Sequence, residues 1–363
     1  MRMISRVPLS IASALALSML VTSPGTAQDA SSRTFVLPYL GSAPETGFQY
    51  GATVFRVRQP ADSATRPSTA QLFASYTAKR QARVFAEVDR WTAGSTWHLT
   101  GHLEWRRFPL PFYGFGDEAP QSAEEFYTPT GVLASAIVQR RVHGPLYVLG
   151  GYSYQDFHID AASPDGALAQ GVVIGDRGGR VGQLQAGALW DDRDDVFASS
   201  RGSFLQATGS VAASAFASDY DFRRLVVDAR HFVPLGESRV LAVQVVTELT
   251  GGAAPFDQMS LVGNSNYLRG YTRGRYRDRD LAAAQAEYRA HLWRKLGWAA
   301  FAGAGRVTSK PSELVGGSAK VLPSYGLGLR WTLFANSRSA IRVDYARGGD
   351  AQSGLYVALN EAF

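Results

Sequence analysis

The sequence contains no cysteine, so no disulfide can stabilise the fold even if the chain is exported. Beyond its N-terminal segment it has no second apolar run near 20 residues, which excludes a helical membrane protein. Charged side chains make up only 19% of the chain, whereas aromatic residues reach 12% and glycine occurs 37 times. This profile is typical of a transmembrane β-barrel. A soluble all-β periplasmic protein is the alternative.

The N-terminal segment has the three parts of a secretory signal. Arg2 and Arg6 supply the positive region, residues 7–21 form a short apolar run, and residues 25–27 are a small-x-small cleavage site. We therefore expect a signal peptide over 1–27 and a single barrel domain over 28–363. Its removal leaves 37 − 2 = 35 basic against 31 acidic side chains, which gives no indication of a nucleic-acid partner.

Alternation of apolar and polar residues predicts β-strands along most of the chain. Over 97–106, Trp97, Leu99, Gly101, Leu103 and Trp105 share one parity, and the residues between them are His98, Thr100, His102, Glu104 and Arg106. A soluble sandwich buries the apolar face, whereas a barrel in lipid exposes it. Alternation alone fits both architectures.

Three further features favour the membrane barrel. The predicted strands run to about 10–13 residues, close to the roughly 9–11 that cross a bilayer at a tilt. Short turns alternate with long connections, of which the longest are 108–126, 160–180 and 251–281. Finally, the chain stops on a predicted strand whose apolar parity includes Leu359 and the last residue, Phe363, as a C-terminal barrel signal.

The pattern predicts an all-β fold, a 16-stranded antiparallel transmembrane β-barrel. An even number of strands places both ends of the barrel in the periplasm. The first strand contains Pro38, which is tolerated best at a sheet edge. The predicted strands are 34–41, 47–58, 67–79, 81–91, 96–107, 129–142, 145–158, 181–191, 202–215, 220–233, 238–251, 282–294, 297–307, 320–334, 339–347 and 354–363.

The connection before the strand at 282–294 is the candidate site. It is about 30 residues long, well above the usual loop limit of roughly 12–15, and such loops are usually functional or disordered. Its glycine- and arginine-rich part cannot be a strand, and Gly270 suits a turn with positive φ. Arg269, if it enters a desolvated interior, needs a carboxylate. The candidates with inward parity are Glu287, Asp344 and Glu248.

These residues resemble motifs of the BamA/TamA family, the bacterial surface-antigen type of outer-membrane barrel. Leu268-Arg269-Gly270-Tyr271 is similar to the signature of the long extracellular loop that, in that family, folds into the lumen. Five strands follow the loop here, as in the family. The resemblance covers nearly the whole mature chain. Its further motifs are Glu287-Tyr288-Arg289, Phe301 with Gly305, the turn at 191–202, and the turn at 43–47.

Two departures from the family pattern bear on function. Assembly-type members carry soluble repeat domains before the barrel, whereas the barrel here begins within about ten residues of the expected cleavage site. Many members also place an aspartate on the Phe301–Gly305 strand as the partner of the signature arginine, and this chain has Ala302, Gly303 and Ala304 there. The resemblance thus implies the tucked-in loop and leaves the partner of Arg269 open.

The sequence gives little support for a catalytic site or a metal site. No nucleophile elbow, metalloprotease, P-loop or dinucleotide motif occurs. His98 and His102 lie roughly 13 Å apart on one strand, too far to share a metal ion. His231 is the one outward-facing histidine on a clear strand, and no neighbouring serine supports it. We expect no catalytic residues, no metal and no cofactor.

The basic run from Arg269 to Arg279 has two interpretations. Asp278 and Asp280 lie between these arginines and neutralise much of their charge, which favours a solvated loop. The more specific alternative is contact with lipopolysaccharide phosphates.

The resemblance implies insertion or transport of proteins or lipids at the outer membrane of a Gram-negative bacterium. A weak seam between the first and last strands would open laterally. The alternative is a passive channel or structural barrel that keeps the fold alone. Expected partners are outer-membrane lipid and an unknown protein or lipid substrate, around a monomeric barrel.

Overall fold

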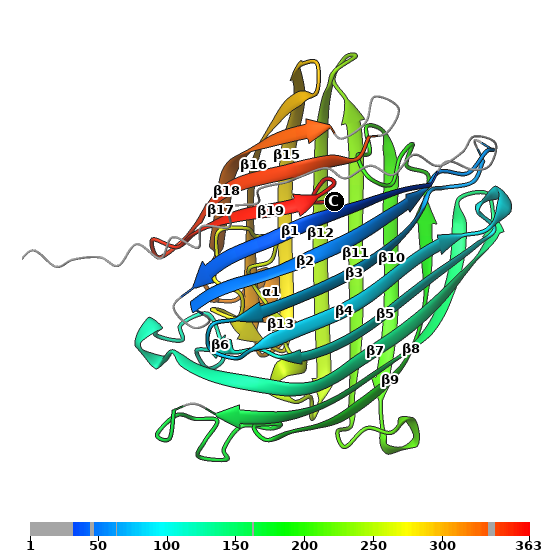
Figure 1. Ribbon diagram of the computed structural model, residues 1–363. Coiled ribbons are helices and arrows are strands. Elements are labelled where there is room, and N and C mark those ends of the chain that lie inside the picture. The colour runs from blue at the N-terminus through cyan, green and yellow to red at the C-terminus, as the bar shows by residue number, and fades with distance from the viewer. Residues whose placement is uncertain (1–31, 44–46, 63, 162, 333–337) are drawn as a thin grey trace, which may run out of the picture.

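The structure is a computed structural model that describes residues 32–43, 47–62, 64–161, 163–332 and 338–363. The expected signal peptide lies outside these residues, as do residues 44–46 of the expected turn at 43–47. Among the described residues, no helix is long and apolar enough to cross a membrane. Figure 1 shows long, tilted strands arranged as one curved wall.

Most of the chain forms one antiparallel sheet of 17 strands. Sixteen of them correspond to the 16 predicted strands, and the seventeenth is the three-residue β6. The strands of this sheet are β1 Ser32–Ala43, β2 Gly47–Arg58, β3 Ser68–Thr77, β4 Ala82–Trp91, β5 Trp97–Arg107, β6 Leu110–Phe112, β7 Glu125–His143, β8 Leu146–Ala161, β9 Gly178–Asp191, β10 Gly202–Ala212, β11 Phe222–Pro234, β12 Arg239–Gly252, β15 Asp280–Trp293, β16 Leu296–Thr308, β17 Leu322–Thr332, β18 Ala340–Gly348 and β19 Ser353–Leu359.

Each long strand pairs with the next one along the chain, and β12 pairs with β15 across the long connection. That connection, residues 253–279, is called the signature loop below. It contains the short pair β13 (Ser260–Leu261) and β14 (Arg277–Asp278), so the expectation that this stretch holds no strand was wrong. A two-residue ladder is too short to produce an alternation pattern. The only α-helix of the described chain, α1 (Glu313–Gly316), lies in the β16–β17 connection.

The register gives the sheet an apolar outward face and a polar inner face. Val54 pairs with Leu72, and Leu72 pairs with Ala86, so apolar side chains from three strands form one row. Val54 and Leu72 are 36% and 51% exposed, which is the reverse of a soluble protein's core. The inner face carries charged side chains such as Glu104 and Glu287, which are buried. This arrangement excludes the soluble sandwich, which would bury its apolar face.

The edges of the sheet are β1 and β19. Pro38 pairs with Ala52 of β2, and β1 forms a ladder with no other strand of the described chain, so the proline sits where a missing N–H costs least. Between β1 and β19 no ladder is formed among the residues that the structure describes. Leu359 nonetheless packs against a cluster that contains Phe35 of β1, so side chains connect the two edges at one end.

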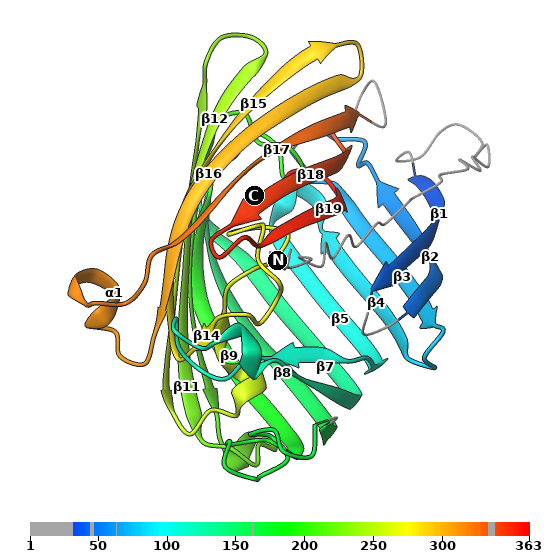
Figure 2. The ribbon, with the colours of Figure 1, turned by 90° about the vertical axis from the view of Figure 1, so that its left-hand side faces the viewer.

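The C-terminal residues leave the sheet, which corrects the predicted strand 354–363. The strand ends at Leu359, and Asn360 adopts φ +64°, which turns the chain. Phe363 is only 5% exposed and packs against Phe232 of β11. Figure 2 shows this end of the chain lying inside the curve of the sheet. Phe363 is therefore not on the outward face, where the strand parity placed it.

Candidate functional site

Arg269 lies at the centre of a buried ion cluster on the inner face of the sheet. Its side chain is fully buried, with Nη2 donating to Oε2 of Glu287 at 2.6 Å and Nη1 donating to Oδ2 of Asp344. The guanidinium stacks on Phe301, with 3.4 Å from Cζ to the ring centroid. The signature loop is thus held by β15, β16 and β18 together.

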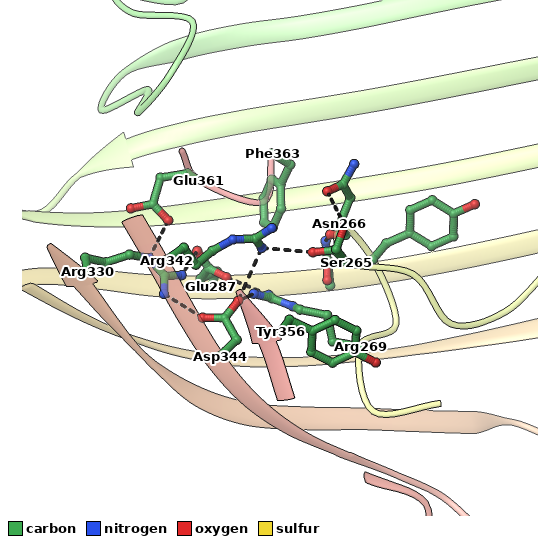
Figure 3. Close-up of polar contacts among 12 residues, drawn as sticks. Ser265, Asn266, Arg269, Glu287, Arg330, Arg342, Asp344, Tyr356, Glu361 and Phe363 are labelled. Atoms are coloured by element: carbon green, nitrogen blue, oxygen red, sulfur yellow. Dashed lines mark hydrogen bonds and ion pairs between the residues drawn. The ribbon is translucent and has the colours of Figure 1, made fainter. Parts of the chain in front are cut away.

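Three more arginines share the same two carboxylates. Figure 3 labels two of them, Arg330 and Arg342. Glu287 accepts from Arg289 at 2.8 Å and from Arg330 at 3.3 Å. Asp344 accepts from Arg330 at 2.5 Å and from Arg342 at 3.2 Å. Each carboxylate is fully buried, so these contacts replace the water that burial removes.

Glu361 adds a third carboxylate from the C-terminal segment. Its Oε2 lies 2.7 Å from Nε of Arg330 and 3.7 Å from Nε of Arg289. The main-chain oxygen of Phe363 accepts from Nη2 of Arg289 at 2.9 Å. Four arginines therefore face three side-chain carboxylates, and the main-chain oxygen of Phe363 accepts one further hydrogen bond from the cluster.

Glycines make room for this cluster at two close approaches. Gly270 has φ +103°, and a Cβ there would lie 2.5 Å from the backbone carbon of Arg347. Gly305 faces Leu268, where a Cβ would lie 2.4 Å from Cδ1. The loop therefore approaches β16 and β18 more closely than a side chain would allow.

The rest of the signature motif anchors the loop through packing and hydrogen bonds. Leu268 is fully buried in an apolar cluster of the inner face. Tyr271 donates from its hydroxyl to the carbonyl of Pro323 at 2.6 Å, and the backbone N–H of Gly270 donates to the hydroxyl of Tyr356 at 2.8 Å. All four motif residues thus contact the wall of strands, and none serves only as a surface turn.

The basic run of the loop is used mostly inside the protein. Arg275 is 5% exposed and lies between the rings of Tyr276 and Tyr113, at 4.4 and 5.0 Å. Arg277 is 3% exposed and donates to the carbonyl of Phe256 at 3.0 Å. This contradicts a fully solvated loop. Arg273 makes no ion pair, hydrogen bond or ring contact with any described residue, and a lipopolysaccharide contact stays a prediction that depends on it and on Arg279.

Of the three candidate partners, Glu287 and Asp344 contact Arg269 and Glu248 does not. Glu248 instead accepts from Arg224 at 3.0 Å and from the hydroxyl of Tyr267 at 2.9 Å. It still stabilises the loop, because Tyr267 belongs to it. The prediction of Glu248 as a partner of Arg269 was wrong because parity gives the face of a strand but not the distance across the interior.

The remaining motif residues divide between the two faces. Arg289 points inward to the cluster, whereas Tyr288 packs against Trp298 with 5.5 Å between ring centroids. In the turn between β9 and β10, Asp191 is buried and binds Arg193 at 2.8 Å and Arg66 at 2.5 Å. Gly202 closes that turn with φ +98°.

Arg330, Tyr356 and Glu361 belong to the site but were not predicted from the sequence. Arg330 lies between the exposed residues Leu329 and Trp331 of β17, so the alternation of apolar and polar residues along this strand could have placed it on the inner face. Glu361 could not be found in this way, because it was assigned to a strand that ends before it.

Groups of three or more histidine or acidic side chains that could hold a metal ion are absent from the described part of the chain. His98 stacks on Trp91 with 3.8 Å between centroids, and its Nε2 lies 2.9 Å from Asp89. Ser203 Oγ lies 2.9 Å from Nδ1 of the exposed His231 on the next strand, a neighbour that sequence distance concealed. No third side chain continues this pair among the described residues, so it does not form a hydrolytic triad.

A large antiparallel sheet with an exposed apolar face and a charged inner face defines an outer-membrane type of β protein. The sequence profile of the Omp85 superfamily domain matches residues 66–363. The chain therefore belongs to the Omp85 superfamily, whose barrels lie in the bacterial outer membrane and are generally not enzymes.

Solved structures agree on the fold. BamA from Haemophilus ducreyi lacking POTRA domains 1–3 is 14% identical, with a TM-score of 0.58, over 92% of this chain and 70% of that one. CdiB from Acinetobacter baumannii is 10% identical, with a TM-score of 0.56, over 96% of this chain and 65% of that one. The chain thus spans about two thirds of the length of each structure. No curated protein matches it.

Proposed function

We propose that this chain is a closed 16-stranded barrel that aids insertion or transport of proteins or lipids at the outer membrane. In this proposal the signature loop occupies the lumen, and the seam between β1 and β19 opens laterally. Export through a cleaved signal over 1–27 and a Gram-negative host belong to the same proposal. The family and the fold it shares with BamA support it.

The observation that carries the proposal is the state of the two edge strands. The β2–β3 ladder has continuous register from Gln49 to Arg58, whereas no ladder joins β1 to β19 within the described ranges. Unpaired strand edges can pair with a strand of another chain. A contact made by the side chains of Leu359 and the Phe35 cluster can separate without breaking a row of backbone hydrogen bonds.

The ion cluster supports a plugged interior. Arg269 ties the loop to β15 and β18, and Glu361 ties the C-terminal segment to β17. An opening at the seam would therefore leave the loop fixed to the wall that ends in β19.

A passive or purely structural barrel is the second candidate. The observation that favours it is the inward fold of residues 360–363, where Glu361 and Phe363 bind Arg330 and Arg289. Such contacts could hold β19 in one position and keep the seam shut.

A cross-link across the seam separates the two candidates. The chain has no cysteine, so Phe35→Cys with Leu359→Cys gives one addressable pair. After bridging with a short bis-maleimide, we expect the reconstituted protein to lose its acceleration of the folding of a second barrel in liposomes. The matched control bridges Val54→Cys and Leu72→Cys, which already face each other in a ladder, and should keep the acceleration.

An uncross-linked protein that gives no acceleration would favour the passive barrel. Equal acceleration with and without the seam cross-link would exclude lateral opening while leaving the fold unaffected.

A further inference from the structure

The outward face of β2 and β4 carries three arginines where lipid-facing residues are otherwise apolar. Arg56, Arg58 and Arg90 are exposed and share strand parity with Val54 and Val88. They lie at the end of the sheet where β1 begins and β19 ends, which we call the terminal rim. None of the three makes an ion pair, hydrogen bond or ring contact with a described residue.

Register brings the three guanidiniums around one hollow. Arg56 and Arg58 are about 7 Å apart along β2, and Arg90 is two strands away, roughly 10 Å. The residues between them are small: Ser68 pairs with Arg58, and Ala70 pairs with Arg56. The hollow has a volume of about 500 Å³ and is lined by all three arginines.

The charge around this hollow is positive. Arg66 also lines it but is paired with Asp191 at 2.5 Å. Of the two acidic residues that line it, Asp89 contacts His98 at 2.9 Å, and Asp62 remains. Three unpaired arginines against Asp62 and Asp89 leave an excess of one positive charge.

Arg56, Arg58 and Arg90 gather on β2 and β4 of the terminal rim, and Arg239 of β12 and Arg294 after β15 are further exposed arginines at this end of the sheet. On β15 and β17, across the seam, the outward residues at the same end are Leu292 and Trp331, which are 55% and 54% exposed. Beyond β4, Arg140 of β7 stacks on Trp97 with 5.3 Å to the ring centroid and continues the basic sector.

From this geometry we propose that Arg56, Arg58 and Arg90 form a binding site for the phosphate of an anionic glycerophospholipid beside the first strands of the barrel. Arginine binds phosphate oxygens through paired N–H donors, and its aliphatic stem can lie on apolar surface while the charge reaches the headgroup layer. The acyl chains would run along Val54, Leu72 and Val88, which are exposed on the same face. A free phosphate ion would use the arginines but not that apolar track.

The test measures lipid retention by the full chain. The protein is reconstituted in nanodiscs of phosphatidylethanolamine with about a quarter phosphatidylglycerol, extracted in mild detergent, and its bound lipids are counted by native mass spectrometry. Each interfacial arginine contributes about a fivefold preference for anionic lipid. We expect the wild type to retain phosphatidylglycerol, and Arg56→Gln, Arg58→Gln and Arg90→Gln together to reduce that retention at least ~10-fold.

The matched control replaces three exposed arginines at the opposite end of the sheet, Arg107→Gln, Arg177→Gln and Arg223→Gln, and should retain the lipid. An equal loss of lipid retention in this control would mean that retention depends only on the net charge of the protein, and this would overturn the proposed site. Displacement of the lipid by millimolar inorganic phosphate would show a free-anion site instead. If the triple variant does not fold, retention by the wild type must still fall as salt rises from about 0.05 to 0.5 M, and a salt-independent retention would overturn the proposal.

Discussion

Replacing Arg269 by alanine should release the signature loop and lower the free energy of unfolding by about 3 kcal/mol, the lower end of the cost of breaking a buried ion pair. The lower end applies because Glu287 keeps Arg289 and Arg330, and Asp344 keeps Arg330 and Arg342. The loop contains four further arginines at 273, 275, 277 and 279, so trypsin added to intact cells reports its release directly.

Arg273→Ala is the matched control for this experiment. It removes an arginine from the same loop, but one that makes no ion pair, hydrogen bond or ring contact with any described residue, so the free energy of unfolding should change by no more than about 0.5 kcal/mol. Equal trypsin resistance of the Arg269→Ala variant and the wild type would mean that the arginine does not anchor the loop.

Replacing Gly270 by alanine should displace the loop without removing any charge. The new Cβ would lie 2.5 Å from the backbone carbon of Arg347, and β18 cannot move away without disturbing its ladders. The residue must also keep φ +103°. We expect a loss of about 3 kcal/mol or more, because strain at positive φ alone costs of order 1–3 kcal/mol.

Gly236→Ala separates the two contributions. Gly236 has φ +93° in the β11–β12 turn, and nothing lies within 4 Å of its added Cβ. It should therefore show only the backbone strain, and the loop should stay resistant to trypsin. If Gly270→Ala were no worse than Gly236→Ala, the close approach of loop and β18 would be unimportant.

Alternation predicted the long strands because the two faces of this sheet meet different surroundings. The long strands of the wall repeat the same contrast, as Leu103 outward and Glu104 inward illustrate. The short elements β6, β13 and β14 contain too few residues to carry that signal. The local backbone geometry could not be predicted from the alternation either. Phe363 has the same parity as Leu359, but the positive φ of Asn360 turns Phe363 inward.

The candidate site was predictable in its components but not in its connections. Arg269 needed a carboxylate on physical grounds, and strand parity limited the choice. Glu287 and Asp344 both bind Arg269 because β15 and β18 approach the same loop. The two carboxylates are 57 residues apart in the sequence (344 − 287), so their common partner could not be predicted from strand parity. On β16, where many members of the resembled family have an aspartate, this chain contacts Arg269 through the ring of Phe301, on which the guanidinium stacks.

The proposed function requires that Arg269 hold the signature loop inside a closed barrel, and planar-bilayer conductance tests this requirement most directly. The wild type should show small, intermittent currents, because a loop that occupies the lumen, as proposed, would leave little continuous water. The Arg269→Ala variant should show larger and steadier currents, while Arg273→Ala should behave as the wild type. A large, steady conductance that is the same in the wild type and in Arg269→Ala would contradict the account.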